Sequence, residues 1–332
     1  MLNNLNLLFL ILMFSSSILA VSASSWLTAW MGLELNMLSF IPLLIEQKNS
    51  FSNESALKYF LIQAMASSMF ILLSITNTFW FFSFSIFNFQ SFNYLLIPLL
   101  LKLGAAPLQA WFIMMMQTLN WWKALLLATW QKFAPLAILS YLNLNKYSLI
   151  FISAFSLTAG SLGGLTQTMF QKIFAFSSIS HLGWIFSSLL ISKNLFFMYF
   201  LFYSFMNTIL FAYMYNLNSY FFNQNLSPAS HPLFFLSMLS LSGLPPFLGF
   251  IPKWMVIQHL TTQNHILMTF ILIISALINL MFYLRLIINA SMMNSISLKW
   301  MNFKSLKLTT MQIMFTFSAT ILGLLLFNLL IT

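Results

Sequence analysis

The chain has 332 residues, of which 61% are hydrophobic and only 5% are charged, and its formal net charge is +10. Soluble domains carry roughly 25% charged residues, so this composition predicts a single integral membrane domain and excludes a separate water-soluble one. The absence of Cys and Asp excludes disulfides and cysteine-held zinc or iron–sulfur sites in this chain.

Apolar runs long enough to cross a bilayer recur along the whole chain. Because about 20 apolar residues span the hydrocarbon core, they predict an all-α, polytopic membrane protein with about 11 transmembrane helices. The predicted spans lie near 3–21, 25–45, 58–78, 94–116, 123–143, 148–168, 172–192, 196–215, 234–258, 266–288 and 307–330. The aromatic stretch 79–89 is either interfacial or part of a span.

Four charged residues lie deep inside these runs, apart from those at or near the ends of the spans. In chain order they are Glu34, Lys102, Lys132 and Lys253. A charge at the bilayer centre costs roughly 2.5–3.5 kcal/mol on insertion scales, and such residues usually mark an ion or proton path. The four residues are therefore the candidate site.

Two of the predicted spans contain helix breakers beside a lysine. Gly104 and Pro107 follow Lys102, and a Gly- and Pro-rich stretch at 243–252 precedes Lys253. Each break falls in the fourth span of a set of five, which predicts a transporter with inverted five-helix repeats and two broken helices. The repeats would cover 1–147 and 148–290, followed by an amphipathic linker and C-terminal helix at 291–332. Breaks that are only packing kinks are the alternative.

His181 lies in the middle of the span near 172–192. A neutral histidine that is hydrogen-bonded within the bundle and a member of a proton relay are both compatible with this position.

The loop lysines predict the orientation of the chain. Lys146 and Lys193 fall on one side of the membrane, and the other side carries Lys48, Lys58, Lys123, Lys172, Lys299, Lys304 and Lys307. Positive loops stay on the side of synthesis, which is the matrix in a mitochondrion. The dispersed basic residues do not form a nucleic-acid surface. Abundant Phe and Met and an N-terminus without a transit peptide indicate an organelle-encoded gene, and an AT-rich bacterial gene is the alternative.

Five motifs resemble one known family. They are WMGLELN (30–36), LLKLGAAP (100–107), WQKFAPL (130–136), QKIFAFSSISHLGW (171–184) and GLPPFLGFIPKW (243–254). Together they resemble subunit 2 of NADH dehydrogenase (ubiquinone), a family of mitochondrially encoded, antiporter-like subunits of respiratory complex I, in an insect-like form. The related subunit 4 carries a glutamate where this chain has Lys253.

The resemblance implies a role for each candidate residue. Glu34 would pair with Lys102, Lys132 would be the connecting lysine, Lys253 would be the terminal lysine, and His181 matches the histidine of the family motif. The chain departs from the family at Leu108 and Gln109, where Phe-His is usual, and at Gln171, where an Arg is frequent.

The resemblance further implies a core membrane-arm subunit that translocates protons across the mitochondrial inner membrane, coupled to electron transfer from NADH to ubiquinone. NAD, FMN and iron–sulfur clusters would reside in partner subunits, with no cofactor or metal in this chain. Expected partners are subunits 4L and 4, accessory subunits and membrane lipids. A stand-alone cation/proton antiporter is the alternative function, although Glu34 is the only acidic residue within a predicted span. A purely structural spacer is disfavoured by the cost of four buried charges.

Overall fold

The computed structural model describes residues 4–46, 49–83, 94–142, 144–217, 219–221, 231–245 and 247–295. Apart from one isolated β-bridge between Met169 and Phe221, these residues form helices and their connections. The predicted C-terminal helix 307–330, most of the stretch 79–89, and Lys48, Lys299, Lys304 and Lys307 lie outside the described residues.

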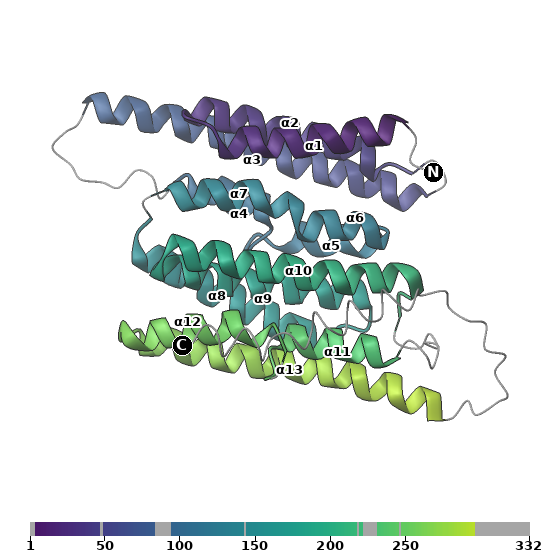
Figure 1. The fold of residues 1–332 in the computed structure, drawn as a ribbon. Helices are drawn as coiled ribbons and strands as arrows, with labels where there is room; N and C mark the ends of the chain where they lie inside the picture. Colours follow the sequence, from purple (N-terminus) through teal and green to yellow (C-terminus); the bar gives the residue numbers. More distant parts are fainter. Residues whose placement is uncertain are drawn as a thin grey trace. The chain divides into compact units, whose positions relative to one another are not determined.

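The described residues confirm the predicted all-α fold (Figure 1). Seven of their helices are long and apolar enough to cross a membrane. The spans predicted at 94–116, 123–143 and 234–258 are each divided into two shorter helices. The helices are α1 (Asn4–Val21), α2 (Trp26–Leu44), α3 (Ser50–Ser83), α4 (Leu96–Leu103), α5 (Ala110–Thr118), α6 (Trp121–Ala128), α7 (Trp130–Tyr141), α8 (Lys146–Leu165), α9 (Phe170–Ile191), α10 (Lys193–Leu217), α11 (His231–Ser242), α12 (Phe250–Thr262) and α13 (Ile266–Ser295).

The chain forms two compact units, Met1–Ile152 and Ser153–Thr332. In the first unit, α1 and α2 approach closely because Gly32 faces the backbone of Ala20, where a Cβ on the glycine would come within 2.7 Å of the Ala20 Cα. Small residues permit this spacing between membrane helices. The inverted relation predicted for the two five-helix sets stays a prediction.

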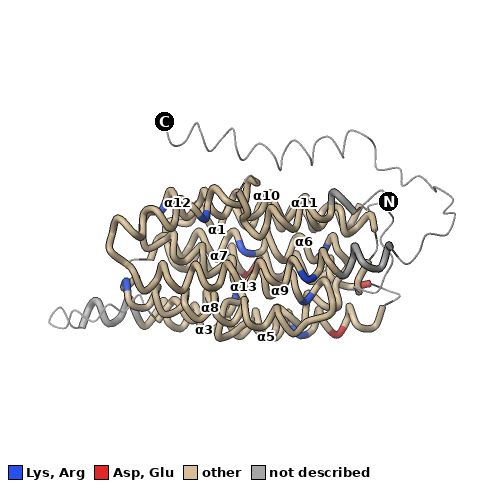
Figure 2. Tube along the Cα trace, turned by 90° about the horizontal axis from the view of Figure 1, so that it is seen from below, with Lys and Arg blue, Asp and Glu red and all other residues tan. Residues whose placement is uncertain are grey.

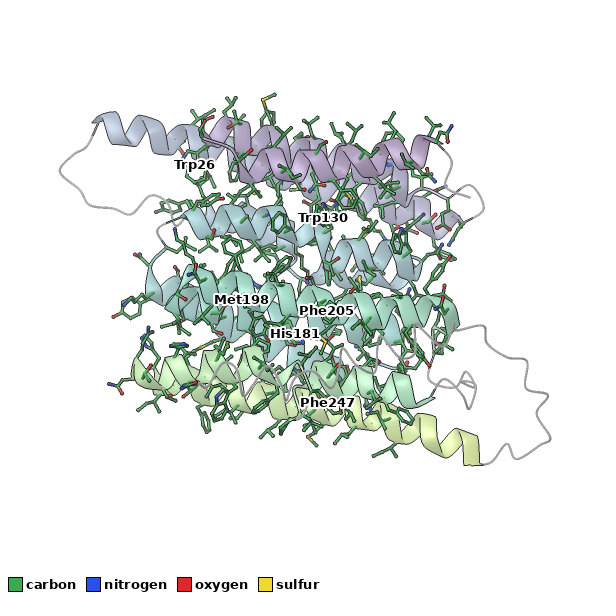
Figure 3. The ribbon with its side chains drawn as sticks, viewed as in Figure 1. Trp26, Trp130, His181, Met198, Phe205 and Phe247 are labelled. Atoms are coloured by element: carbon green, nitrogen blue, oxygen red, sulfur yellow. The ribbon has the colours of Figure 1, made fainter. Side chains whose placement is uncertain are left out.

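In the second unit, α9 is the central helix. Its residues are almost all buried, from Phe170 to Ser188. Ser and Gly on α9 allow neighbours to pack against it: the Cβ of an alanine at Gly183 would lie 2.6 Å from Leu157 Cγ on α8. His181 lies on this helix, inside the unit (Figure 3).

The outer faces of the helices are apolar, as a lipid-facing surface requires. Met198 and Phe205 on α10 are exposed examples (Figure 3). Few charged positions interrupt the helices (Figure 2). The buried lysines therefore stand out against a nearly uncharged background.

Candidate functional site

The first predicted break is present and lies directly after Lys102. Gly104, at φ +65°, ends α4 in the left-handed conformation, and α5 begins at Ala110 after a cis bond between Ala106 and Pro107. The departures from the family pattern at Leu108 and Gln109 leave this break in place. Lys102 is buried in the last turn of α4.

Side chains bond to two backbone carbonyls at the end of α4, next to the break. The Trp111 indole Nε1 donates to the Leu101 carbonyl at 3.0 Å, and Gln63 Nε2 donates to the Lys102 carbonyl at 3.4 Å. In a membrane, where bulk water cannot pair these groups, such donors make an interrupted helix possible. Gln63 and Trp111 therefore hold the backbone on which Lys102 sits.

Lys132 also lies at a helix interruption, which the sequence analysis did not predict. The helix is interrupted at Thr129, between α6 and α7, where the Thr129 hydroxyl donates to the Leu125 carbonyl at 2.8 Å. Pro135 contributes a physical reason, because its ring removes the N–H that would pair with the carbonyl of Gln131. Lys132 is 2% exposed, in the first turn of α7, and its Nζ lies 4.7 Å from the ring centroid of Phe112.

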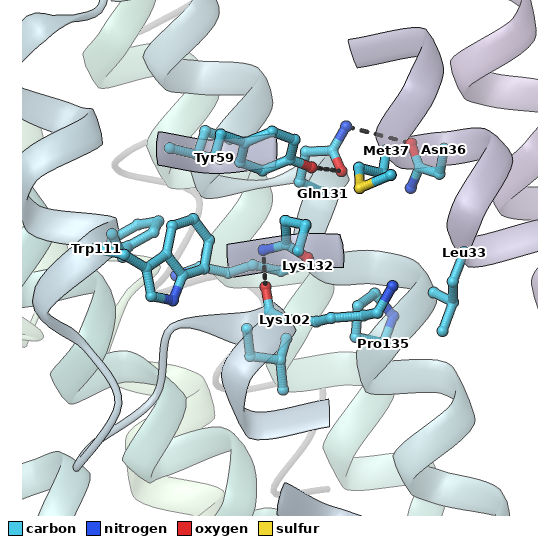
Figure 4. A pocket seen from close by; sticks show the side chains of 13 residues that line it. Leu33, Asn36, Met37, Tyr59, Lys102, Trp111, Gln131, Lys132 and Pro135 are labelled. Carbon is cyan, nitrogen blue, oxygen red and sulfur yellow. Dashed lines mark hydrogen bonds between the residues drawn. The ribbon is translucent and has the colours of Figure 1, made fainter. Parts of the chain in front are cut away.

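Lys102 and Lys132 line one cavity of about 20 Å³ (Figure 4). That volume fits about one water molecule. The polar part of the wall consists of the two lysines together with Asn36, Tyr59, Gln63 and Gln131. The structure thus brings together two lysines that are 30 positions apart in the sequence, as a proton path requires.

Glu34 lies near this cavity but does not line it. On α2 the cavity side consists of Leu33, Asn36 and Met37, and Glu34 lies beside that face. Within the described residues no ion pair or hydrogen bond joins Glu34 to Lys102, and Glu34 Oε2 is buried without a hydrogen-bond partner. The carboxylate still acts on Lys102 electrostatically. The structure therefore shows no direct contact for the pairing that the resemblance implies, and the pairing stays a prediction.

The second predicted break is present before Lys253. Helix α11 ends at Ser242, Gly243 takes φ +78°, and α12 begins at Phe250. Lys253 is buried in the first turn of α12, and its Nζ donates to the carbonyls of Leu241 at 3.1 Å and Ser242 at 2.7 Å. A cation at the carbonyl end of a helix is favoured by the helix dipole. This lysine is therefore held by the broken helix itself.

His181, on α9, lies beside this break. Its Nδ1 and the Tyr199 hydroxyl form a hydrogen bond of 3.1 Å. His181 and Tyr199 share a cavity of about 10 Å³ with Leu241, Gly249 and Pro252 of the break. Both alternatives for His181 fit this geometry, since it is bonded within the bundle and also adjoins a break that carries a lysine.

The sequence analysis missed the neutral polar residues of the site. Asn36, Tyr59, Gln63 and Gln131 are all buried within apolar helices. For Asn36 and Gln131 the available signal was an amide within two positions of a candidate charge, because unpaired amides are costly in a membrane, whereas Tyr59 and Gln63 have no such neighbour. No group of three His, Cys, Asp or Glu suited to a metal occurs among the described residues.

Comparison with known proteins identifies the family. The model of the transmembrane family described as NADH:quinone oxidoreductase/Mrp antiporter matches residues 23–279. NADH-ubiquinone oxidoreductase chain 2 of the mosquito Anopheles gambiae is 44% identical over 323 residues, which cover 94% of each chain. The protein of the same name from Xenopus laevis is 40% identical over 282 residues, covering 82% of each chain.

Two solved structures have a similar fold. A chain of respiratory complex I from Thermus thermophilus matches with a TM-score of 0.78 and 23% identity, covering 87% of this chain and 71% of that one. A chain of the Mrp complex from Dietzia sp. matches with a TM-score of 0.75 and 15% identity, covering 84% and 59%. The family match and the relatives over nearly the whole length show that this chain belongs to the NADH:quinone oxidoreductase and Mrp antiporter membrane family, within its NADH-ubiquinone oxidoreductase chain 2 group.

Proposed function

We propose that this chain translocates protons through its buried lysines, as a membrane subunit of the complex that oxidises NADH and reduces ubiquinone. The observation that carries the proposal is that Lys102, Lys132 and Lys253 are each buried within one turn of a helix interruption. Buried lysines change their protonation readily when a nearby charge or the hydration changes. A break supplies the polar backbone groups and the space for water that this exchange needs.

In the first unit, a proton would pass between Lys102 and Lys132. Both side chains line the same cavity, and a single water there suffices to connect them. Glu34 biases Lys102 from outside the cavity wall, so a change at Glu34 would alter the proton occupancy of Lys102 first.

In the second unit, Lys253 is the proton-carrying group and the carbonyls of Leu241 and Ser242 are its acceptors. His181 is hydrogen-bonded to Tyr199 and adjoins the same break. His181 is therefore the group that would exchange protons with Lys253.

The energy must come from partner subunits. Each proton moved against the membrane potential costs about 2.3 kcal/mol per 100 mV. The sequence has no Cys to ligate an iron–sulfur cluster. We infer that NAD, FMN and iron–sulfur clusters are bound elsewhere in the complex, that subunits 4L and 4 and accessory subunits are neighbours, and that the chain is mitochondrially encoded and resides in the inner membrane. The family of the chain and its named relatives support this assignment.

The test is Lys132→Met in the intact complex, reconstituted into proteoliposomes. We expect assembled complex in near-normal amount and a loss of proton translocation of at least about tenfold, as when a positioned proton-transfer group is removed. Lys58→Met is the matched control, because Lys58 is exposed and forms an ion pair with Glu54 on its own helix. Unchanged translocation in Lys132→Met would contradict the proposal.

A stand-alone cation/proton antiporter is the second candidate, favoured by the fold shared with the Mrp complex chain. Purification in mild detergent separates the two. Co-migration with NADH-oxidising activity supports the complex, whereas an isolated chain that exchanges cations for protons supports the antiporter. A sodium site needs several oxygen ligands, and Glu34 is the only acidic residue in a predicted span.

A further inference from the structure

Three buried neutral side chains form a hydrogen-bonded chain in the wall of the cavity between Lys102 and Lys132. The Tyr59 hydroxyl donates to Gln131 Oε1 at 3.3 Å, and Gln131 Nε2 donates to Asn36 Oδ1 at 3.2 Å (Figure 4). The three side chains come from α3, α7 and α2, and all three line the cavity. The amide of Gln131 is thereby fixed at both ends.

The hydrogen-bonded row of Tyr59, Gln131 and Asn36 supports both lysines. Gln131 directly precedes Lys132 in the first turn of α7, so fixing Gln131 restricts the backbone that carries Lys132. At the other end, the Tyr59 ring lies 6.1 Å from the ring of Trp111, whose indole holds the Leu101 carbonyl beside Lys102. Tyr59 therefore lies between the structural supports of the two lysines.

Asn36 of this hydrogen-bonded row is also the polar residue that α2 places in the cavity wall. Leu33, Asn36 and Met37 face it, whereas Glu34 does not. The polar contact between α2 and the lysine cavity is thus made by the neutral Asn36. A neutral, fixed wall orients a water between two lysines without holding either proton itself.

We propose that Asn36, Gln131 and Tyr59 are positioning residues for proton transfer between Lys102 and Lys132. They fix the geometry of the cavity, so that a proton passes between the lysines through one oriented water. This inference rests on the proposed function of the lysines, and its test must separate the two.

The test uses Tyr59→Phe and Gln131→Met in the intact, reconstituted complex. Tyr59→Phe removes one oxygen and keeps the ring, so it preserves packing even if Gln131→Met impairs assembly. We expect each variant to lower coupled proton translocation per assembled complex by about 3- to 10-fold, the range of one lost hydrogen bond. The matched control is Tyr141→Phe, which loses a 3.1 Å hydrogen bond to the Val21 carbonyl outside the cavity and should translocate normally.

Two readouts distinguish positioning from a general structural role. A slower proton transfer should enlarge the solvent isotope effect of Tyr59→Phe, whereas a mere loss of folded complex leaves it unchanged. The double variant of Tyr59→Phe with Gln131→Met should be no slower than the worse single variant, because both break the same chain. An unchanged isotope effect, or single effects that add, would overturn the proposal.

Lys132→Met belongs in the same series. If it abolishes translocation while Tyr59→Phe behaves as wild type, the positioning role is wrong and the lysine path stands. If Lys132→Met itself translocates normally, the proposed function fails and takes the positioning role with it.

Discussion

Backbone carbonyls hold the Lys253 ammonium, and no carboxylate pairs with it among the residues that the structure describes. Its Nζ donates to Leu241 and Ser242 and lies 5.8 Å from the ring centroid of Trp184. The two carbonyls are dipoles that stabilise the ammonium, but neither they nor the Trp184 ring can accept its proton. Backbone carbonyls at the end of α11 are therefore the polar partners that the structure gives to the Lys253 ammonium.

For Lys253→Met we expect assembly near normal and coupled proton translocation reduced at least about tenfold. The methionine keeps a similar length and leaves only carbonyls unpaired, which water in the break can satisfy. The proton-to-electron ratio and NADH:quinone activity of the reconstituted complex measure this. A normal ratio at normal activity would show that Lys253 carries no protons.

Among the described residues Glu34 and Lys102 form no ion pair, so we expect a weaker coupling than for two residues in contact. Removing one partner of a buried contact pair costs about 3–5 kcal/mol, so Glu34→Gln should cost less than that. We expect Glu34→Gln to slow proton transfer and Glu34→Asp to be milder, because it retains the charge. Combining Glu34→Gln with Lys102→Met should do no more harm than the worse single change. Pumping in the four variants is the measurement, and simple addition of the single effects would show that the two residues are uncoupled.

At the scale of helices, two glycines permit the break before Lys253, each for a different steric reason. Gly243 takes φ +78°, and a Cβ there would lie 2.7 Å from Lys253 Cδ. Gly249 has an ordinary φ, but a Cβ there would lie 1.8 Å from the Ser240 carbonyl oxygen. The backbone just before α12 therefore packs directly against the backbone near the end of α11. Gly243 thus leaves space for the Lys253 side chain, and Gly249 allows the two backbone segments to approach each other.

We therefore expect Gly249→Ala to reduce assembly more than Gly243→Ala, since a backbone carbonyl cannot move aside as a side chain can. Gly243→Ala should cost about 1–2 kcal/mol for its left-handed conformation and also displace Lys253, lowering pumping in the complex that does assemble. Amounts of assembled complex and pumping per complex are the readouts. Gly164→Ala is the control, because its Cβ would meet only the ring of Phe282 at 3.0 Å. Equal assembly of all three variants would contradict this account.

The sequence predicted most helices and two of the three interruptions. Ten of the eleven predicted spans coincide with helices or broken helices, because apolar length and the Gly and Pro signals at 104–107 and 243–252 are local. The interruption at Thr129 escaped prediction because no Gly or Pro stands beside Thr129, and Pro135 lies six positions further along the chain. The contact of Gln131 with Asn36 joins positions 95 apart, and only the packed structure reveals it.

At the scale of the whole molecule, the first unit indicates which helix ends share a membrane surface. Lys123, at the start of α6, forms an ion pair of 2.6 Å with Glu46, directly after α2, and donates to the Leu44 carbonyl. These two ends therefore lie together, as the lysine distribution predicts. Lys146 begins α8 after the chain has passed through α6 and α7, so it lies at the opposite end.

This arrangement gives a topology prediction for the mitochondrial membrane. Lys58 in the first third of α3 and Lys146 at the start of α8 are both exposed, and the excess of positive residues assigns the Lys58 side to the matrix. In right-side-out mitoplasts, an impermeant amine reagent should therefore label Lys146 and leave Lys58 unlabelled until the membrane is lysed. Labelling of the detergent-purified complex is the control, since both lysines must react there for the comparison to hold. Modification of Lys58 in intact mitoplasts would reverse the assigned orientation, and with it the side from which protons reach the cavity between Lys102 and Lys132.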